Sequence, residues 1–91
     1  MRYEYDAHSD ALYIVLLEEA PDHQEEMEDG TIVDVTAEGR VRGVDVMIPS
    51  GGWDANAIIE RFSLDQSTAA ALRLMTNFVF SLTPVGTDAS Q

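Results

Sequence analysis

Residues 11–17 read ALYIVLL, and this stretch decides the fold of the chain. In an extended conformation its side chains alternate between two sides, and both sides are apolar. One side holds Leu12, Ile14 and Leu16, and the other holds Tyr13, Val15 and Leu17. A short run of aromatic and β-branched residues that is apolar on both sides predicts a central β-strand covered on both faces.

The rest of the first half has the pattern of short strands separated by turns. Residues 2–6 alternate charged and tyrosine side chains, which predicts a half-buried strand. Residues 24–28 (QEEME) are mostly charged, which is typical of an edge strand that resists pairing with other chains. Residues 31–36 and 41–48 are expected to form a hairpin, and Gly43 within it predicts a bulge or a close approach of neighbouring backbone.

The hydrophobic period becomes helical after Pro49, which itself ends the predicted sheet. Asp54 is placed to cap a first helix, because its carboxylate can accept a hydrogen bond from an amide of the first turn. The expected buried face of this helix holds Ala55, Ile58, Ile59 and Phe62.

A second helix follows, capped by Ser63 or Asp65 and rich in alanine at its start. The period alone does not decide whether residues 76–82 continue this helix or form a strand. The apolar stripe of the helix holds Leu72, Met75, Val79 and Leu82, and it is widened by Ala71, Leu74 and Phe78.

These elements predict an α+β fold, in which an antiparallel β-meander of four or five strands is followed by two C-terminal helices. We expect a single domain over residues 1–83, because a chain of 91 residues rarely divides further. Within it, residues 1–48 form the meander and residues 53–82 the helical extension. Residues 84–91 are expected to be a disordered tail.

The predicted fold leaves apolar surface without cover. A chain of this length hides little more than ~60% of its unfolded surface. Two helices cover one face of the sheet, so the other face or the outer side of the last helix needs a partner. We therefore expect a homodimer, the commonest closed assembly. Its seam is assigned to Leu72, Met75, Phe78, Val79 and Leu82.

The charge balance excludes several classes of function. Seventeen acidic residues face five arginines and no lysine, which gives a net charge of −12. Nucleic acids and anionic membrane surfaces would repel such a chain. The absence of cysteine excludes disulfides and thiol chemistry. No apolar run reaches the ~18 residues of a membrane span, and the start lacks a signal core, so a soluble cytoplasmic protein is expected.

The acidic residues concentrate in one stretch, which is the predicted partner-binding surface. An electrostatic surface of this kind attracts a basic protein and speeds the encounter at low salt. Two alternatives remain open: a solvated face that keeps the chain soluble, and weak binding of divalent cations. The surface is assigned to Glu18, Glu19, Asp22, Glu25, Glu26, Glu28 and Asp29.

A second candidate site lies between the first two predicted strands. Asp6, His8 and Asp10 occupy alternate positions, and their carboxylates and imidazole are ligands for a divalent metal ion. The competing interpretation is that Asp6 and Asp10 hold a turn through bonds to backbone amides. We assign no catalytic residue, and we expect no cofactor beyond a weakly held divalent cation.

The first half also has a recognisable series of motifs. Residues 3–16 read YEYDAHSDALYIVL, and residues 25–47 read EEMEDGTIVDVTAEGRVRGVDVM. Their spacing resembles the small prokaryotic family called domain of unknown function 2283, over about residues 1–50. The resemblance implies an antiparallel meander and no defined activity. Some members lie beside small toxin-like genes, which implies a protein-binding role.

The sequence therefore predicts a non-enzymatic, homodimeric protein-binding domain with a toxin-neutralising or regulatory accessory role. The alternative is a divalent-metal-binding protein or a small metal-dependent hydrolase that uses Asp6, His8 and Asp10.

Overall fold

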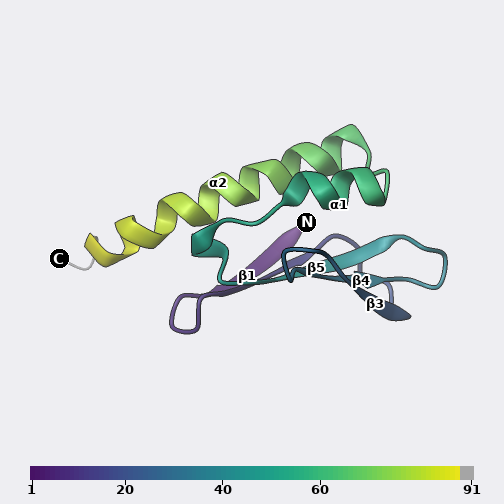
Figure 1. Cartoon of the computed structure of the whole chain (residues 1–91), viewed down its shortest axis with the longest axis horizontal. Helices are drawn as coiled ribbons and strands as arrows, with labels where there is room; N and C mark the ends of the chain where they lie inside the picture. Colours follow the sequence, from purple (N-terminus) through teal and green to yellow (C-terminus); the bar gives the residue numbers. More distant parts are fainter. Residues whose placement is uncertain (89–91) are drawn as a thin grey trace.

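All strands of the structure precede its helices along the chain (Figure 1). The computed structural model describes the backbone of residues 1–88 and the side chains of residues 1–77. The α+β class is confirmed, because five antiparallel strands form one sheet and two α-helices follow it. The elements are β1 (Arg2–Asp6), β2 (Ala11–Val15), β3 (His23–Glu26), β4 (Ile32–Val35), β5 (Val41–Met47), the 3₁₀ turn η1 (Pro49–Gly51), α1 (Ala55–Arg61) and α2 (Gln66–Asp88).

The strand order is β1-β2-β5-β4-β3, so β5 lies in the middle and β1 and β3 are the edges. The strands follow meander order only through β3, β4 and β5, and the β1–β2 hairpin pairs with β5. The chain after β2 crosses the end of the sheet, where the amides of Leu16 and Leu17 donate to the Arg42 carbonyl at 2.9 and 3.1 Å. The charged segment expected at an edge is β3, and the ALYIVLL stretch supplies the interior strand β2.

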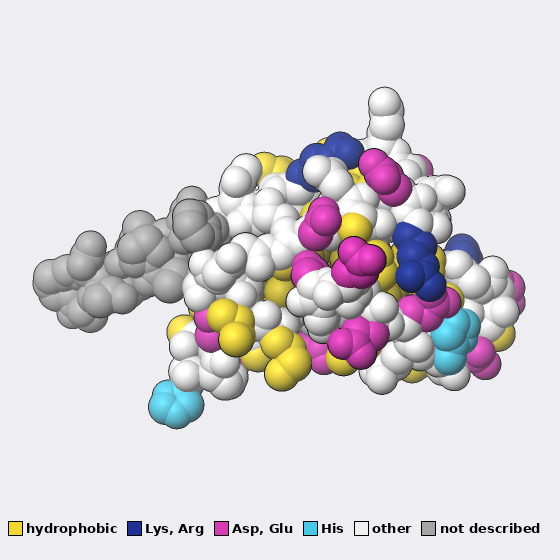
Figure 2. All heavy atoms as spheres, in the orientation of Figure 1, with side chains coloured by type: hydrophobic (Ala, Val, Ile, Leu, Met, Phe, Trp, Pro, Cys, Tyr) yellow, Lys and Arg dark blue, Asp and Glu magenta, His cyan; other side chains and the backbone are white. Residues whose placement is uncertain are grey.

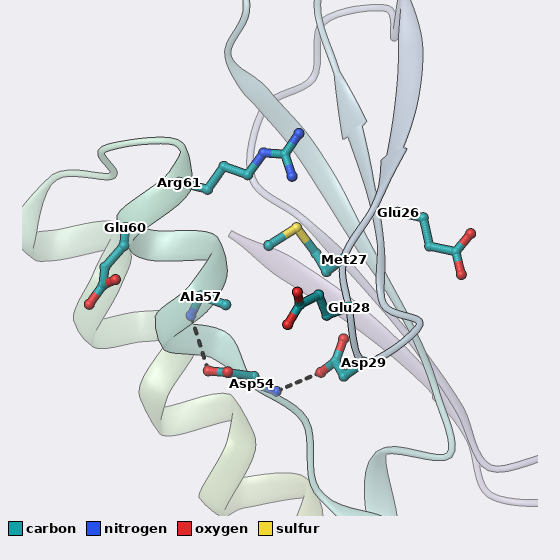
Figure 3. A pocket seen from close by; sticks show the side chains of 8 residues that line it. All are labelled: Glu26, Met27, Glu28, Asp29, Asp54, Ala57, Glu60 and Arg61. Atoms are coloured by element: carbon teal, nitrogen blue, oxygen red, sulfur yellow. Dashed lines mark hydrogen bonds between the residues drawn. The ribbon is translucent and has the colours of Figure 1, made fainter.

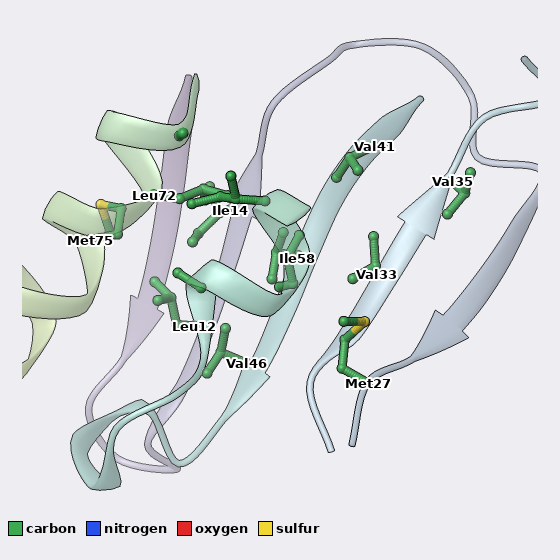
Figure 4. Packing of buried hydrophobic residues seen from close by; sticks show 14 residues of the cluster. Leu12, Ile14, Met27, Val33, Val35, Val41, Val46, Ile58, Leu72 and Met75 are labelled. Carbon is green, nitrogen blue, oxygen red and sulfur yellow. The ribbon is translucent and has the colours of Figure 1, made fainter. Parts of the chain in front are cut away.

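One face of the sheet packs against both helices and forms the core (Figure 4). The cross-strand partners Ile14, Val44 and Val33 lie in one row on this face, and none of them is exposed. Ile58 of α1 and Leu72 of α2 are equally buried in the same cluster. Burial of each such side chain contributes ~1.5–3 kcal/mol. This row therefore holds the helices on the sheet.

No helix covers the opposite face of β2, although the sequence predicted a strand covered on both faces. Tyr13 lies across Gly43 of β5, where a Cβ atom would come within 2.3 Å of the tyrosine Oη. The Tyr13 hydroxyl donates to Asp34 Oδ2 at 2.6 Å and accepts from Arg42 Nη1 at 2.8 Å. The β4–β5 register also shifts just after Asp34, the partner of Gly43. Position 43 thus has both predicted features, a close approach and an adjacent bulge.

The helix caps follow the sequence pattern. Asp54 accepts a hydrogen bond from the Ala57 amide at 3.0 Å, and Asp65 accepts one from the Thr68 amide at 2.8 Å. Of the two candidate caps for the second helix, Asp65 is therefore the one that caps it. Ser63 instead lies in the link between the helices, with a φ of 51°. These caps fix where each helix begins.

Helix α2 spans Gln66–Asp88, so residues 76–82 are helical. The structure corrects part of the dimer-seam assignment, because Leu72 and Met75 face the core of their own chain with 0% and 5% of their surface exposed. Side chains buried in this way are not available to a second copy. Of the expected tail at 84–91, residues 84–88 belong to α2 and residues 89–91 lie outside the described part. The side chains of the other assigned seam residues, Phe78, Val79 and Leu82, also lie outside the described part.

Strand β5 ends at Met47, one residue before the predicted boundary. Ile48 has a φ of 58°, a left-handed conformation that β-branched residues rarely adopt. Its amide donates to the Asp10 carbonyl at 2.8 Å, and its own carbonyl accepts from the Gly51 amide at 3.1 Å. The chain therefore turns away from the sheet here. The side chains of Met47 and Ile48 remain 67% and 63% exposed.

Candidate functional site

The acidic stretch does not form one continuous patch. Its strand and loops distribute the seven carboxylates over different sides of the molecule. Figure 2 shows acidic side chains spread among neutral and apolar surface, with arginine side chains beside some of them. The stretch therefore divides into residues that pair with basic groups and residues that gather at a cleft.

The first group is engaged by arginine. Arg2 Nε donates to Glu18 Oε2 at 3.1 Å, and Arg40 forms an ion pair with Glu19. These groups are largely exposed, so each pair stabilises the fold by ~1 kcal/mol or less. The pairs nevertheless leave these two carboxylates with less of their charge available to a partner.

A second paired cluster lies on β3. His23 Nδ1 is 2.9 Å from Asp22 Oδ2, and His23 Nε2 is 3.2 Å from Glu25 Oε2. Hydrogen bonds that the His23 ring donates to Asp22, and then to Glu25, raise the pKa of His23 above its ordinary value. Glu25 also binds Arg61 of α1, which ties the edge strand to the helix. This part of the stretch is therefore structural.

The remaining three acidic residues lie at a cleft between α1 and the turn from β3 to β4 (Figure 3). Its volume is about 720 Å³. Figure 3 shows Glu28 pointing toward α1, whereas Glu60 lies on the outer side of α1 and the side chain of Glu26 points away from α1. The apolar side chains of Met27 and Ala57 supply part of its lining. The residues around the cleft are Glu26, Met27, Glu28, Asp29, Asp54, Ala57, Glu60 and Arg61.

Two of the cleft carboxylates hold the backbone together. Asp29 accepts from the Thr31 amide at 3.0 Å and from the Asp54 amide at 2.9 Å. Burial alone would raise the pKa of Asp29, but the bonds from Thr31 and Asp54 outweigh it and lower the pKa. Asp54 in turn caps α1 through Ala57. The β3–β4 turn and the start of α1 are thus joined through one aspartate.

The other three cleft carboxylates have no such role. Among the described side chains, those of Glu26, Glu28 and Glu60 make no hydrogen bond or ion pair. Arg61, the arginine of the cleft, is bonded to Glu25 and lies over the Phe62 ring at 5.6 Å from its centroid. The cleft therefore presents negative charge that its own arginine does not neutralise.

Two of the predicted metal ligands, Asp6 and Asp10, stabilise turns of the backbone instead. Asp6 accepts from the His8 amide at 3.0 Å and from the Ser9 hydroxyl at 2.9 Å, and the Ser9 bond is the main cause of its lowered pKa. Asp10 accepts from the Tyr5 hydroxyl at 3.1 Å and also bonds Ser50. Within residues 1–77, no three His, Cys, Asp or Glu side chains are arranged to hold a metal ion. Asp6, His8 and Asp10 are therefore not brought together as a metal site.

Sequence reasoning missed the α1 side of the cleft. Asp54, Ala57 and Glu60 recur every three residues, so they share one side of the helix next to its buried face. That spacing was the available signal. It does not reveal that the β3–β4 turn packs opposite this side, because local spacing holds no information on which elements meet.

Three comparisons place the chain among known proteins. A family model described as a protein of unknown function (DUF2283) matches residues 2–47, which covers all five strands. No curated protein and no solved structure matches the chain. Over residues 1–88, neither helix has both the length and the apolarity needed to cross a membrane. The match includes half of the chain and ends with β5, and on this basis the chain belongs to the DUF2283 family of proteins of unknown function.

Proposed function

We propose that the chain is a non-enzymatic protein-binding domain whose acidic cleft holds a basic segment of a partner protein. The observation that supports this is the pair of unpaired carboxylates on Glu28 and Glu60, beside an arginine already bonded elsewhere. A lysine or arginine of the partner supplies the missing opposite charge. Such binding fits a toxin-neutralising or a regulatory accessory role.

The lining of the cleft suits a long cationic side chain. Lysine and arginine lay their alkyl stems on apolar surface and keep the charged group near polar atoms. Met27 and Ala57 offer that apolar surface, and Glu28 lies beside them. The net charge of −12 attracts a basic partner from a distance, so the association rate is expected to fall as salt rises.

The test compares two double variants with equal charge. Glu28→Gln/Glu60→Gln removes two charges at the cleft, and Glu18→Gln/Glu38→Gln removes two elsewhere. The probe is a short peptide of alternating arginine and serine, titrated by calorimetry at low salt. The cleft variant is expected to bind about tenfold more weakly than the unchanged chain, and the control within about twofold of it. Equal losses in both variants would refute a site at the cleft.

A homodimer is the second part of the proposal. Helix α2 extends beyond the sheet, and the molecule measures 47 × 24 × 23 Å (Figure 1). Leu74 on α2 is 66% exposed, an apolar side chain that a second α2 would cover. Light scattering is expected to give twice the 10.0 kDa mass of the chain. Leu74→Glu should shift the mass to one chain and Asn77→Glu should not; a monomer in the unchanged chain would contradict the dimer.

A further inference from the structure

The sheet face opposite the helices has no layer over it within the described residues (Figure 1). We call it the open face. The strand register fixes its composition, because directly paired residues point to the same side. The pairs Glu4–Tyr13, Tyr13–Asp45, Ile32–Asp45 and Glu26–Ile32 join into one row across all five strands. Negative and apolar residues alternate along this row, which consists of Glu4, Tyr13, Asp45, Ile32 and Glu26.

A shorter neighbouring row adds exposed apolar surface. Asp6 pairs with Ala11, and Ala11 pairs with Met47. Met47 is 67% exposed, and Ile48 beyond it is 63% exposed in its strained left-handed conformation. Strain of this kind tends to occur where function requires it. Met47 thus adds an exposed apolar side chain at one end of the open face, and Ile48 exposes a second one in the turn that follows.

The positive charge near the open face is already used. Arg42 donates to the Tyr13 hydroxyl at 2.8 Å and to the Glu19 carbonyl at 3.1 Å. Asp34 is satisfied by the Tyr13 hydroxyl at 2.6 Å and by Gln24 Nε2 at 2.8 Å. The polar groups of this network therefore bond one another. Arg2, at the edge of the sheet, is shared between Glu18 at 3.1 Å and Glu4 at 3.8 Å, so Glu4 is weakly paired and neither arginine pairs with Asp45.

Asp45 is the exception at the centre of the open face. It lies on the middle strand, and among the described residues its carboxylate has no hydrogen bond or ion pair. Burial, and then the charge of Asp34, raise its pKa. A cavity of about 450 Å³ lies beside it, between Glu4 and Tyr13. A half-buried carboxylate without a partner is stabilised when a cation is brought to it.

We propose that the open face is a docking surface for a basic amphipathic helix of a partner protein, with arginine or lysine directed at Asp45 and Glu4 and apolar residues on Met47 and Ile32. Five strands spaced ~4.8 Å apart give a surface ~19 Å wide, which accommodates a helix ~10 Å across. The helices on the other face pack in the same way.

Charge selects this occupant over two others. A second copy of the chain would bring the same acidic row against Glu4, Asp45 and Glu26, and like charges repel. An added strand would pair with the edges β1 or β3 rather than lie across the face. The surface borders the acidic cleft at Glu26, but Glu4, Tyr13, Asp45 and Met47 lie away from that cleft, so the inference does not depend on the function proposed for it.

The location is tested by amide NMR of the full ¹⁵N-labelled chain. The probe is a peptide of about 18 residues with one leucine stripe flanked by arginine, and its counterpart has glutamate in place of arginine. The arginine peptide is expected to shift amides of β1, β2 and β5 and to leave α1 unchanged. Shifts confined to the cleft, an equal response to the glutamate peptide, or no shift up to ~1 mM would each overturn the proposal.

Two variants test the chemistry of the surface. Asp45→Asn is expected to weaken binding of the arginine peptide about tenfold, and Met47→Ser several-fold. Glu38→Gln removes one charge from the exposed β4–β5 turn and is expected to change binding less than about twofold. Circular dichroism confirms that each variant is folded. Equal binding by all three variants would overturn the proposal, whereas a loss in Glu28→Gln/Glu60→Gln alone would favour the cleft.

Discussion

Replacing Gly43 by alanine is the sharpest test of how the open face is built. A Cβ atom at this position would lie 2.3 Å from Tyr13 Oη, 2.7 Å from Tyr13 Cζ and 2.9 Å from the carbonyl oxygen of Ile14. The Ile14 oxygen belongs to the backbone of β2 and has little freedom to move. The tyrosine ring must therefore leave its place over β5.

The energetic cost follows from what Tyr13 loses. Forcing an extra methyl group into packed structure costs ~1–3 kcal/mol. The displaced hydroxyl no longer donates to Asp34, which is only 9% exposed. Loss of the donor to a buried acceptor costs a further ~1–3 kcal/mol. The lower chain entropy of alanine returns ~0.5–1 kcal/mol. With the middle of each range, Gly43→Ala should destabilise the fold by about 3 kcal/mol, or roughly 12–24 °C in melting temperature.

Urea denaturation of four variants checks this reasoning. In a Tyr13→Val background the ring is absent, and only the contact with the Ile14 oxygen opposes the new methyl group. There Gly43→Ala should cost about 1 kcal/mol, which leaves a coupling energy of at least ~1 kcal/mol between positions 13 and 43. A cost below ~0.5 kcal/mol in the unchanged chain, or the same cost in both backgrounds, would refute the account.

Three further predictions concern single charged groups. Because the pKa of Asp45 is raised on folding, the folded chain binds the proton of Asp45 more tightly than the unfolded chain, and stability falls as pH rises between the two pKa values. In urea denaturation, Asp45→Asn should therefore stabilise the chain at pH 7 but not below about pH 3. Equal effects at both pH values would contradict this. Asp54→Ala should lower the unfolding free energy by ~1 kcal/mol, because alanine has no side-chain oxygen to cap α1. Asp54→Asn should lower it by much less, because asparagine caps as aspartate does. Similar losses in the two variants would argue against capping. NMR titration should place the pKa of His23 above 6.5, and Glu25→Gln should lower it; an unchanged pKa in the variant would contradict the contribution of Glu25.

Local patterns predicted the elements well, because each depends on neighbouring residues. The period of the apolar residues gave both helices, and Asp54 and Asp65 are the caps that their positions suggested. Gly43 marked the place where Tyr13 crosses the sheet. The strand order was not accessible in this way, because nothing within ALYIVLL specifies that β2 pairs with β5 rather than with β3.

The sites were harder to predict, because they depend on which elements meet. The carboxylates of one acidic stretch point to different sides of β3 and its loops, so only Glu28 and Asp29 direct theirs toward the cleft with α1. The turn bonds of Asp6 and Asp10 were the competing interpretation of the metal candidate, and the structure has those bonds. Asp45 could not be predicted as a binding residue, because only the strand register places it between Tyr13 and Ile32 on a face that neither helix covers.

The junction after Met47 divides the part of the chain that the family model matches from the part that it does not match. The family match ends there, and α1 and α2, which bury Ile14, Val33 and Val44, lie beyond it. Residues 2–47 thus form a sheet with an apolar face that the strands cannot cover by themselves. Substitutions in the helices or on the open face can then change what covers the sheet, or which partner it binds, without altering the pairing of the strands.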